Sequence, residues 1–94
     1  MNKKTDEFFA RLKVELDNST QWPAEYLFKF IVPTTEANVK EVENAFNGLG
    51  AVIKTTKSKN QTFTSVSINV QMASAQAVVD KYIELSTIEG IISL

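Results

Sequence analysis

Cysteine and histidine are both absent from this sequence. Without cysteine, the chain has no disulfide, no thiolate nucleophile and no cysteine-ligated metal. Without histidine, it has neither the usual proton shuttle nor the commonest transition-metal ligand. We therefore expect no catalytic residues, no metal site, no cofactor and no enzymatic activity. The lack of cysteine also fits a reducing compartment, so the expected localisation is the cytoplasm.

Long hydrophobic runs are missing as well. No segment approaches the roughly 18 apolar residues that a membrane span needs. Lys3 and Lys4 could begin a signal peptide, but Asp6, Glu7 and Arg11 interrupt any apolar core after them. The sequence therefore predicts a soluble protein that does not bind membranes. Its 94 residues are enough for one folded domain and no more.

Acidic residues are absent from one long stretch of the chain. The net charge is −1, yet no Asp or Glu occurs between Asn44 and Val79. Lys54, Lys57 and Lys59 fall in this stretch and could contact an anion or a phosphate backbone. A solvated hairpin explains the same lysines without any ligand. The near-neutral total charge argues against a surface built for nucleic acid, which we do not expect as the main partner.

The apolar periodicity predicts an N-terminal amphipathic helix followed by strand, helix, strand, strand, helix and strand. The apolar stripe of the first helix is Phe8, Phe9, Leu12 and Leu16. The expected helix caps are Thr5, then Thr34 or Thr35, and then Ser74. The expected strands are residues 25–32, 51–56, 62–72 and 90–94.

This order of elements predicts an α+β fold of the ferredoxin-like βαββαβ type. The expected architecture is a two-layer sandwich of a four-stranded antiparallel sheet with two helices on one face. An arm of residues 1–21 would precede a domain of residues 22–94. The first strand is apolar on both faces, so we expect it to be central and covered on both sides. The expected core stripes of the two helices are Val39, Val42, Phe46 and Leu49, and Ala75, Val78, Tyr82 and Leu85.

The helix-free face of the sheet is the candidate site for a ligand or partner. In the third strand, alternation directs Val66, Ile68 and Val70 to the helices. The candidate ligand or partner residues on the other face are Lys29, Ser65, Ser67 and Asn69. Three interpretations stay open for this face: the arm helix covers it by packing on Leu27 and Ile31, two copies of the chain meet through it, or a partner or ligand binds it.

Two chemistries known on this type of fold fit the residues poorly. Acylphosphatase activity needs an arginine and a cradle of N–H groups after the first strand. Here Pro33 has no N–H to donate, and the one arginine, Arg11, lies in the arm. RNA-recognition domains stack bases on aromatic side chains of the helix-free face. Phe63 is the one aromatic residue that we place there, because Tyr26, Phe28 and Phe30 are expected in the core.

Several positions, one in the first strand and the rest in the second half, carry a resemblance to a known family. They are Lys29, Ser58, residues 63–68, Gln76, Tyr82, Leu85 and residues 91–94. Together they resemble the YbeD-like family of bacterial domains of unknown function (domain of unknown function 493). The likeness covers most of residues 22–94, and none of these motifs is catalytic.

The resemblance implies an ACT-like domain, similar in shape to the regulatory domains of amino-acid biosynthetic enzymes. The family often has a glycine in the hairpin loop, where this chain has Lys59-Asn60-Gln61, and another after the first strand, where it has Val32-Pro33. ACT domains commonly bind an amino acid near such a glycine. These departures argue against amino-acid sensing.

The sequence thus predicts a small regulatory or adaptor domain that binds a protein partner or a small ligand without catalysis. The alternative is weak binding of nucleic acid or the ribosome through Lys54, Lys57 and Lys59. A homodimer also stays open, because the apolar residues 91–94 form a strand without charges that would discourage pairing with another chain.

Overall fold

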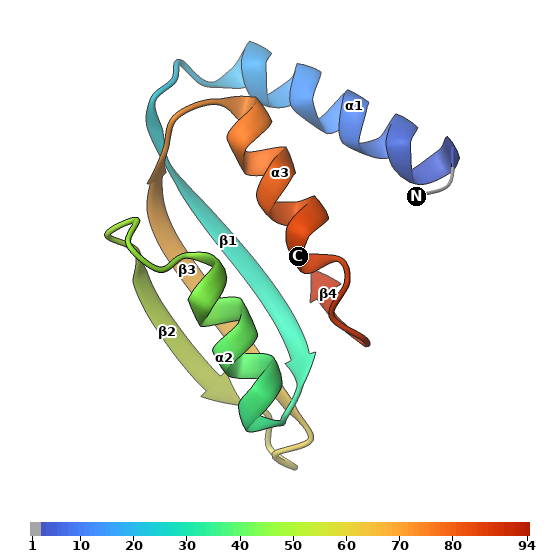
Figure 1. The fold of residues 1–94 in the computed structure, drawn as a ribbon, viewed down its shortest axis with the longest axis vertical. Coiled ribbons are helices and arrows are strands. Elements are labelled where there is room, and N and C mark those ends of the chain that lie inside the picture. The colour runs from blue at the N-terminus through green and yellow to red at the C-terminus, as the bar shows by residue number, and fades with distance from the viewer. Residues whose placement is uncertain (1–2) are drawn as a thin grey trace.

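A computed structural model describes residues 3–94. In that range three helices and one four-stranded antiparallel sheet form the predicted ferredoxin-like order after an N-terminal helix (Figure 1). The sheet order is β2-β3-β1-β4, which makes β1 and β3 the central strands. The elements are α1 (Lys3–Ser19), β1 (Ala24–Pro33), α2 (Glu36–Ala45), β2 (Val52–Lys57), β3 (Phe63–Met72), α3 (Ala75–Leu85) and β4 (Ile92–Ser93).

The two central strands pair along their whole length, from Ala24 with Met72 to Pro33 with Phe63. Alternation directs every second side chain of both strands toward α2 and α3. The residues so buried include Phe28, Phe30, Val32, Val66, Ile68 and Val70. Burial of each stabilises the fold by about 1.5–3 kcal/mol, so this layer is the main source of stability.

The other face of β1 is not covered, which contradicts the expectation of cover on both sides. Leu27 is 51% exposed there. Within residues 3–94 the helices lie on the opposite face of the sheet (Figure 1). Apolar residues on both faces of a strand therefore indicated a central position in the sheet, but not a second covering layer.

Side chains cap both helices of the βαββαβ unit as their sequences predict. Thr35 Oγ1 accepts a hydrogen bond from the Asn38 N–H at 3.0 Å, so Thr35 rather than Thr34 is the cap of α2. Ser74 Oγ accepts one from the Ala77 N–H at 3.1 Å at the start of α3. The helices therefore begin where the caps predict.

The predicted core stripe of α2 fails at its last member. Val42 and Phe46 are buried, whereas Leu49 is 43% exposed. The helix ends at Ala45, and the following turn adopts a positive φ of 77° at Gly48. Beyond the end of a helix the spacing of 3.6 residues no longer holds, so Leu49 leaves the core face.

Helix α1 packs against α3 and not across the helix-free face of the sheet (Figure 1). The expectation that it covers Leu27 and Ile31 is therefore wrong. Leu16 and Trp22 join the core near the end of α1 and fix the direction of the helix. The helix already includes Lys3, so the predicted start at Thr5 is two residues late.

Gly90 gives a test of the turn that brings β4 beside β1. Its φ is +80°, and a Cβ placed there would lie 2.9 Å from Cγ of Pro33. We expect Gly90→Ala to lower the free energy of unfolding by about 2 kcal/mol or more, because it adds a clash to the cost of a positive φ. Gly48→Ala is the matched control: its φ is +77° with open space around the site, and it should cost about 1 kcal/mol. Urea unfolding measures both, and equal losses would contradict this account of Gly90.

Candidate functional site

The helix-free face of the sheet, called here the open face, brings the predicted partner residues together in three rows. The strand registers define the rows. They are Val52, Asn69 and Leu27; then Lys54, Ser67 and Lys29; then Thr56, Ser65, Ile31 and Ile92. Lys29, Ser65, Ser67 and Asn69 are thus neighbours, as the sequence predicted, and their role as a site stays a prediction.

The middle row holds a serine between two lysines. Lys29 and Lys54 are each directly opposite Ser67 on the two sides of β3. Their Cα atoms are therefore two strand spacings apart, about 10 Å. The ion pairs within the described residues are Glu36–Lys40 and Lys81–Glu84, so neither open-face lysine has a carboxylate partner there.

A hollow lies on each side of this lysine row. The larger, with a volume of about 390 Å³, has a mainly apolar surface and is lined in part by Ile31, Phe63, Ser65 and Ile92. The smaller, of about 160 Å³, is partly polar and is lined by Leu27, Val52, Lys54, Ser67 and Asn69. The open face therefore offers a positive centre between an apolar hollow and a smaller, mixed one.

The three lysines proposed for nucleic-acid contact occupy different positions of the β2–β3 hairpin, although Lys57 also lines the larger hollow of the open face. Lys54 belongs to the open face, beside Ser67. Lys57 pairs with the buried Thr64, so its position in the strand alternation is opposite to that of Lys54. Lys59 lies in the turn between β2 and β3. Pairing the strands outward from the hairpin turn places Lys54 opposite Ser67, and Ser67 is also opposite Lys29. This signal in the sequence would have grouped Lys54 with Lys29.

A third hollow, similar in size to the larger one of the open face, lies between the arm helix and the rest of the protein. We name it the arm groove, and its volume is about 380 Å³. None of its lining side chains is charged. They are Phe8, Phe9 and Leu12 of α1, Tyr26 of β1, Tyr82 and Ser86 of α3, and Ile91, Ser93 and Leu94.

Two tyrosines form a hydrogen bond at the base of this groove. Their hydroxyl oxygens, from Tyr26 and Tyr82, are 2.9 Å apart. Burial, and then the hydrogen bond with Tyr26, raise the pKa of Tyr82 far above its ordinary value of 10.0. The neutral phenol is therefore held in place, which suits a structural role and not an acid–base role near neutral pH.

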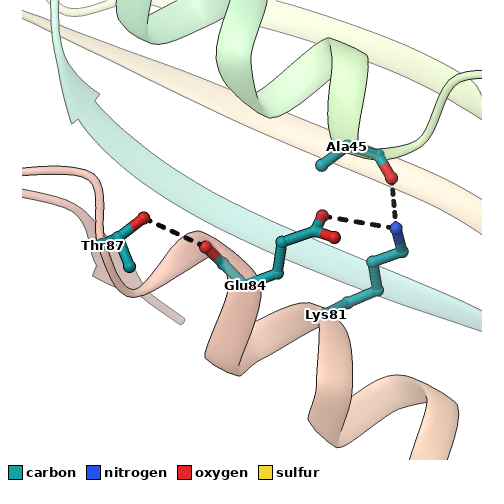
Figure 2. Close-up of polar contacts among 4 residues, drawn as sticks. All are labelled: Ala45, Lys81, Glu84 and Thr87. Carbon is teal, nitrogen blue, oxygen red and sulfur yellow. Dashed lines mark hydrogen bonds and ion pairs between the residues drawn. The ribbon is translucent and has the colours of Figure 1, made fainter.

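The polar cluster between α2 and α3 is also structural (Figure 2). Lys81 Nζ donates a hydrogen bond to the carbonyl of Ala45, the last residue of α2. The same ammonium lies 3.4 Å from a carboxylate oxygen of Glu84 and 5.4 Å from the centre of the Phe46 ring. A cation at a helix C-terminus satisfies free carbonyls and the helix dipole, so Lys81 acts as a cap supplied by another helix.

Two further properties concern the described part of the chain alone. Between residues 3 and 94 the acidic side chains form no cluster that could hold a metal ion. In the same range no helix is both long and apolar enough to cross a membrane.

The comparison with protein families gives one match. Residues 17–94, from the last turns of α1 to beyond β4, match the family described as "Protein of unknown function (DUF493)". The chain belongs to the DUF493 family. This confirms the resemblance that the sequence suggested. A search of curated proteins and a search of solved structures each found no match.

The description of DUF493 names no activity, ligand or partner. The match begins in the last turn of α1, at residue 17. It therefore includes Trp22, which packs against the core, but not Leu16 or the groove residues Phe8, Phe9 and Leu12. The groove is therefore built partly from outside the matched segment.

Lys81 provides a test of how this DUF493 domain holds its two helices together. We expect Lys81→Met, which keeps the apolar stem and removes the ammonium, to lower the free energy of unfolding by about 1–2 kcal/mol. Lys40→Met is the matched control, because Lys40 pairs only with the exposed Glu36 and should cost less than about 0.5 kcal/mol. Chemical unfolding followed by circular dichroism gives both values. Equal losses would show that Lys81 is an ordinary surface lysine.

The tyrosine pair predicts how the stability of the DUF493 domain depends on alkaline pH. In the unfolded chain Tyr82 loses its proton near pH 10, whereas the folded protein keeps the proton at that pH. The contribution of Tyr82 is therefore constant below about pH 10 and falls above it, by up to about 1.4 kcal/mol per pH unit. Tyr82→Phe should flatten this part of the stability curve. Unfolding measured between about pH 8 and about pH 11 checks it, and parallel curves for the two proteins would refute it.

Proposed function

We propose that this DUF493 chain is a non-catalytic, cytoplasmic regulatory or adaptor domain that binds a protein partner through its open face. The observation that supports the proposal most directly is the middle row, in which Lys29 and Lys54 flank Ser67 without a carboxylate partner among residues 3–94. The preferred partner is an acidic segment of another protein.

Charge complementarity favours an acidic partner. β2 and β3 contain no acidic residue, and in β1 the one carboxylate, Glu25, pairs with Gln71 at the far end of the face. A carboxylate placed over Ser67 could accept a hydrogen bond from its hydroxyl and from both ammonium groups. Charge-assisted hydrogen bonds of this type are stronger than those between neutral groups.

The exposed apolar side chains beside the lysine row favour a protein segment over a free anion. Leu27 is 51% exposed and Val52 is 61% exposed on one side of the lysine row, and Ile92 lies on the other. Apolar side chains next to an acidic residue could enter the two hollows, which an inorganic anion would leave empty. A partner with both kinds of side chain would use more of the face.

Nucleic-acid binding stays the alternative, through Lys54, Lys57 and Lys59. Their placement favours it less, because Lys57 differs from Lys54 in strand alternation and Lys59 lies in the turn, so the three form no continuous row. Phe63, the one aromatic residue that the described open face presents, lines a hollow. The usual platform of stacked bases needs more than one aromatic side chain.

The proposal is tested by titrating the protein with a short capped peptide of alternating glutamate and leucine. NMR is expected to show shifts concentrated on the open-face residues of β1, β2 and β3. The double variant Lys29→Gln/Lys54→Gln should bind roughly threefold to tenfold more weakly, because two partly exposed ion pairs are lost. The same peptide with glutamine in place of glutamate should show the same weakening.

The matched control is Lys13→Gln/Lys40→Gln, which removes the same charge from α1 and α2. This double variant should bind the acidic peptide like the original protein. Equal weakening in the two double variants would mean that only the total charge matters, and would overturn the open-face site. If the protein bound a single-stranded oligonucleotide more tightly than the acidic peptide, and lost that binding on replacement of Lys57 and Lys59, the result would support the nucleic-acid alternative instead.

A further inference from the structure

The outer edge of β1 is paired over only a small part of its length. On one side β1 pairs with β3 from Ala24 to Pro33. On the other side it pairs with β4 at Phe30 and Ile31 alone, so among the described residues no strand lies beside residues 24–28. This stretch is an open strand edge in the middle of the molecule.

The hydrogen bonds of β4 show which backbone groups face that edge. The Leu94 N–H donates to the carbonyl of Lys29 at 2.9 Å. In an antiparallel ladder every second residue directs its N–H and C=O to the same side. The backbone groups of Leu27 and Glu25 therefore point to the open edge, whereas those of Tyr26 and Phe28 point to β3.

The arm groove lies beside the same edge, on the helix side of the sheet. Tyr26 of β1 and Leu94 after β4 line the groove from the sheet. Phe9 and Leu12 of α1 line it from the arm helix. Phe8 is 58% exposed. Apolar side chains of α1 thus line the groove beside residues 24–28 of β1, where the described sheet has no neighbouring strand.

We propose that the open edge of β1 and the arm groove form one docking site for an extended segment of a partner protein. The segment adds to the sheet antiparallel to β1, in line with β4. Every second side chain, opposite Tyr26 and Phe28, is apolar and uncharged and enters the groove, because no charged side chain lines it. The intervening side chains are polar. This site is separate from the acidic-segment site on the open face and does not depend on it.

A single strand fits this edge better than a second copy of the chain does. In a second copy, α3 covers the helix side of β1, as it does here (Figure 1). Pairing two β1 edges would bring that helix into the layer where α1 lies. An isolated extended segment brings no helix, and α1 supplies the cover that it needs.

The first experiment joins a designed strand directly after Leu94 of the full chain. The strand alternates valine and threonine and begins with valine, so the valines fall opposite Phe28 and Tyr26. Hydrogen exchange of the Leu27 and Glu25 amides should slow by about tenfold or more. The Tyr26 and Phe28 amides, which face β3, serve as the internal reference.

Two matched extensions serve as controls. A glycine–serine extension of the same length tests the effect of added chain alone. An extension that begins with threonine exchanges the faces, so that threonine enters the groove. Both should slow the Leu27 amide less than the first design does. Equal protection from all three, or no protection from the first, would overturn the proposal.

The second experiment supplies the same valine–threonine segment as a free peptide to the unextended protein. In the proposed register the threonine amides face β1 and the valine amides face solvent. A peptide N-methylated on its valines should protect the Leu27 and Glu25 amides, and one N-methylated on its threonines should not. Failure of the valine-methylated peptide, or equal protection by both, would overturn the proposal. A dimer in light scattering of the unextended protein, with these amides already protected, would assign the edge to a second copy instead.

Discussion

The pairing of β1 with β3 is the interaction on which the rest of this structure depends. The two strands are far apart in the sequence, and α2 and β2 form the connection between them. Their alternation places one layer of side chains under α2 and α3, which cover it. This layer includes Phe28, Phe30, Val66 and Ile68. The same register decides what the opposite face carries, because a shift of one residue would exchange the two sets of side chains. Core and candidate site are therefore consequences of one alignment.

The strand alternation explains why so much of the fold could be predicted. In β3 the contrast between Val66-Ile68-Val70 and Ser65-Ser67-Asn69 defines a buried and an open face without any structure. Ser74 and Thr35 mark the helix starts equally well, because a capping side chain acts on its own neighbours. These features are local, and local features can be read from a single sequence.

Two of the departures from the expected structure concern relations between distant segments. The apolar stripe of α1 showed that the helix must pack on something, but not whether α3 or the open face is the surface. Leu16 and Trp22 pack against the core and so place α1 beside α3. The sequence around these two residues does not indicate which way the helix will run. The lysines show a related effect: Lys54, Lys57 and Lys59 are close in sequence, whereas proximity on a sheet follows strand register. Lys54 belongs with Lys29, 25 residues away in numbering.

Trp22 has a consequence of a different kind. It is the one tryptophan of the chain, and it packs on the core just where α1 passes into β1. Its indole Nε1 is buried and has no hydrogen-bond partner among the described residues. The fluorescence of this residue therefore reports on the junction between arm and sheet with no competing tryptophan signal. Detachment of α1 would admit water to the indole and shift its emission to longer wavelength, so the natural chain already carries an optical sensor for the position of its own arm.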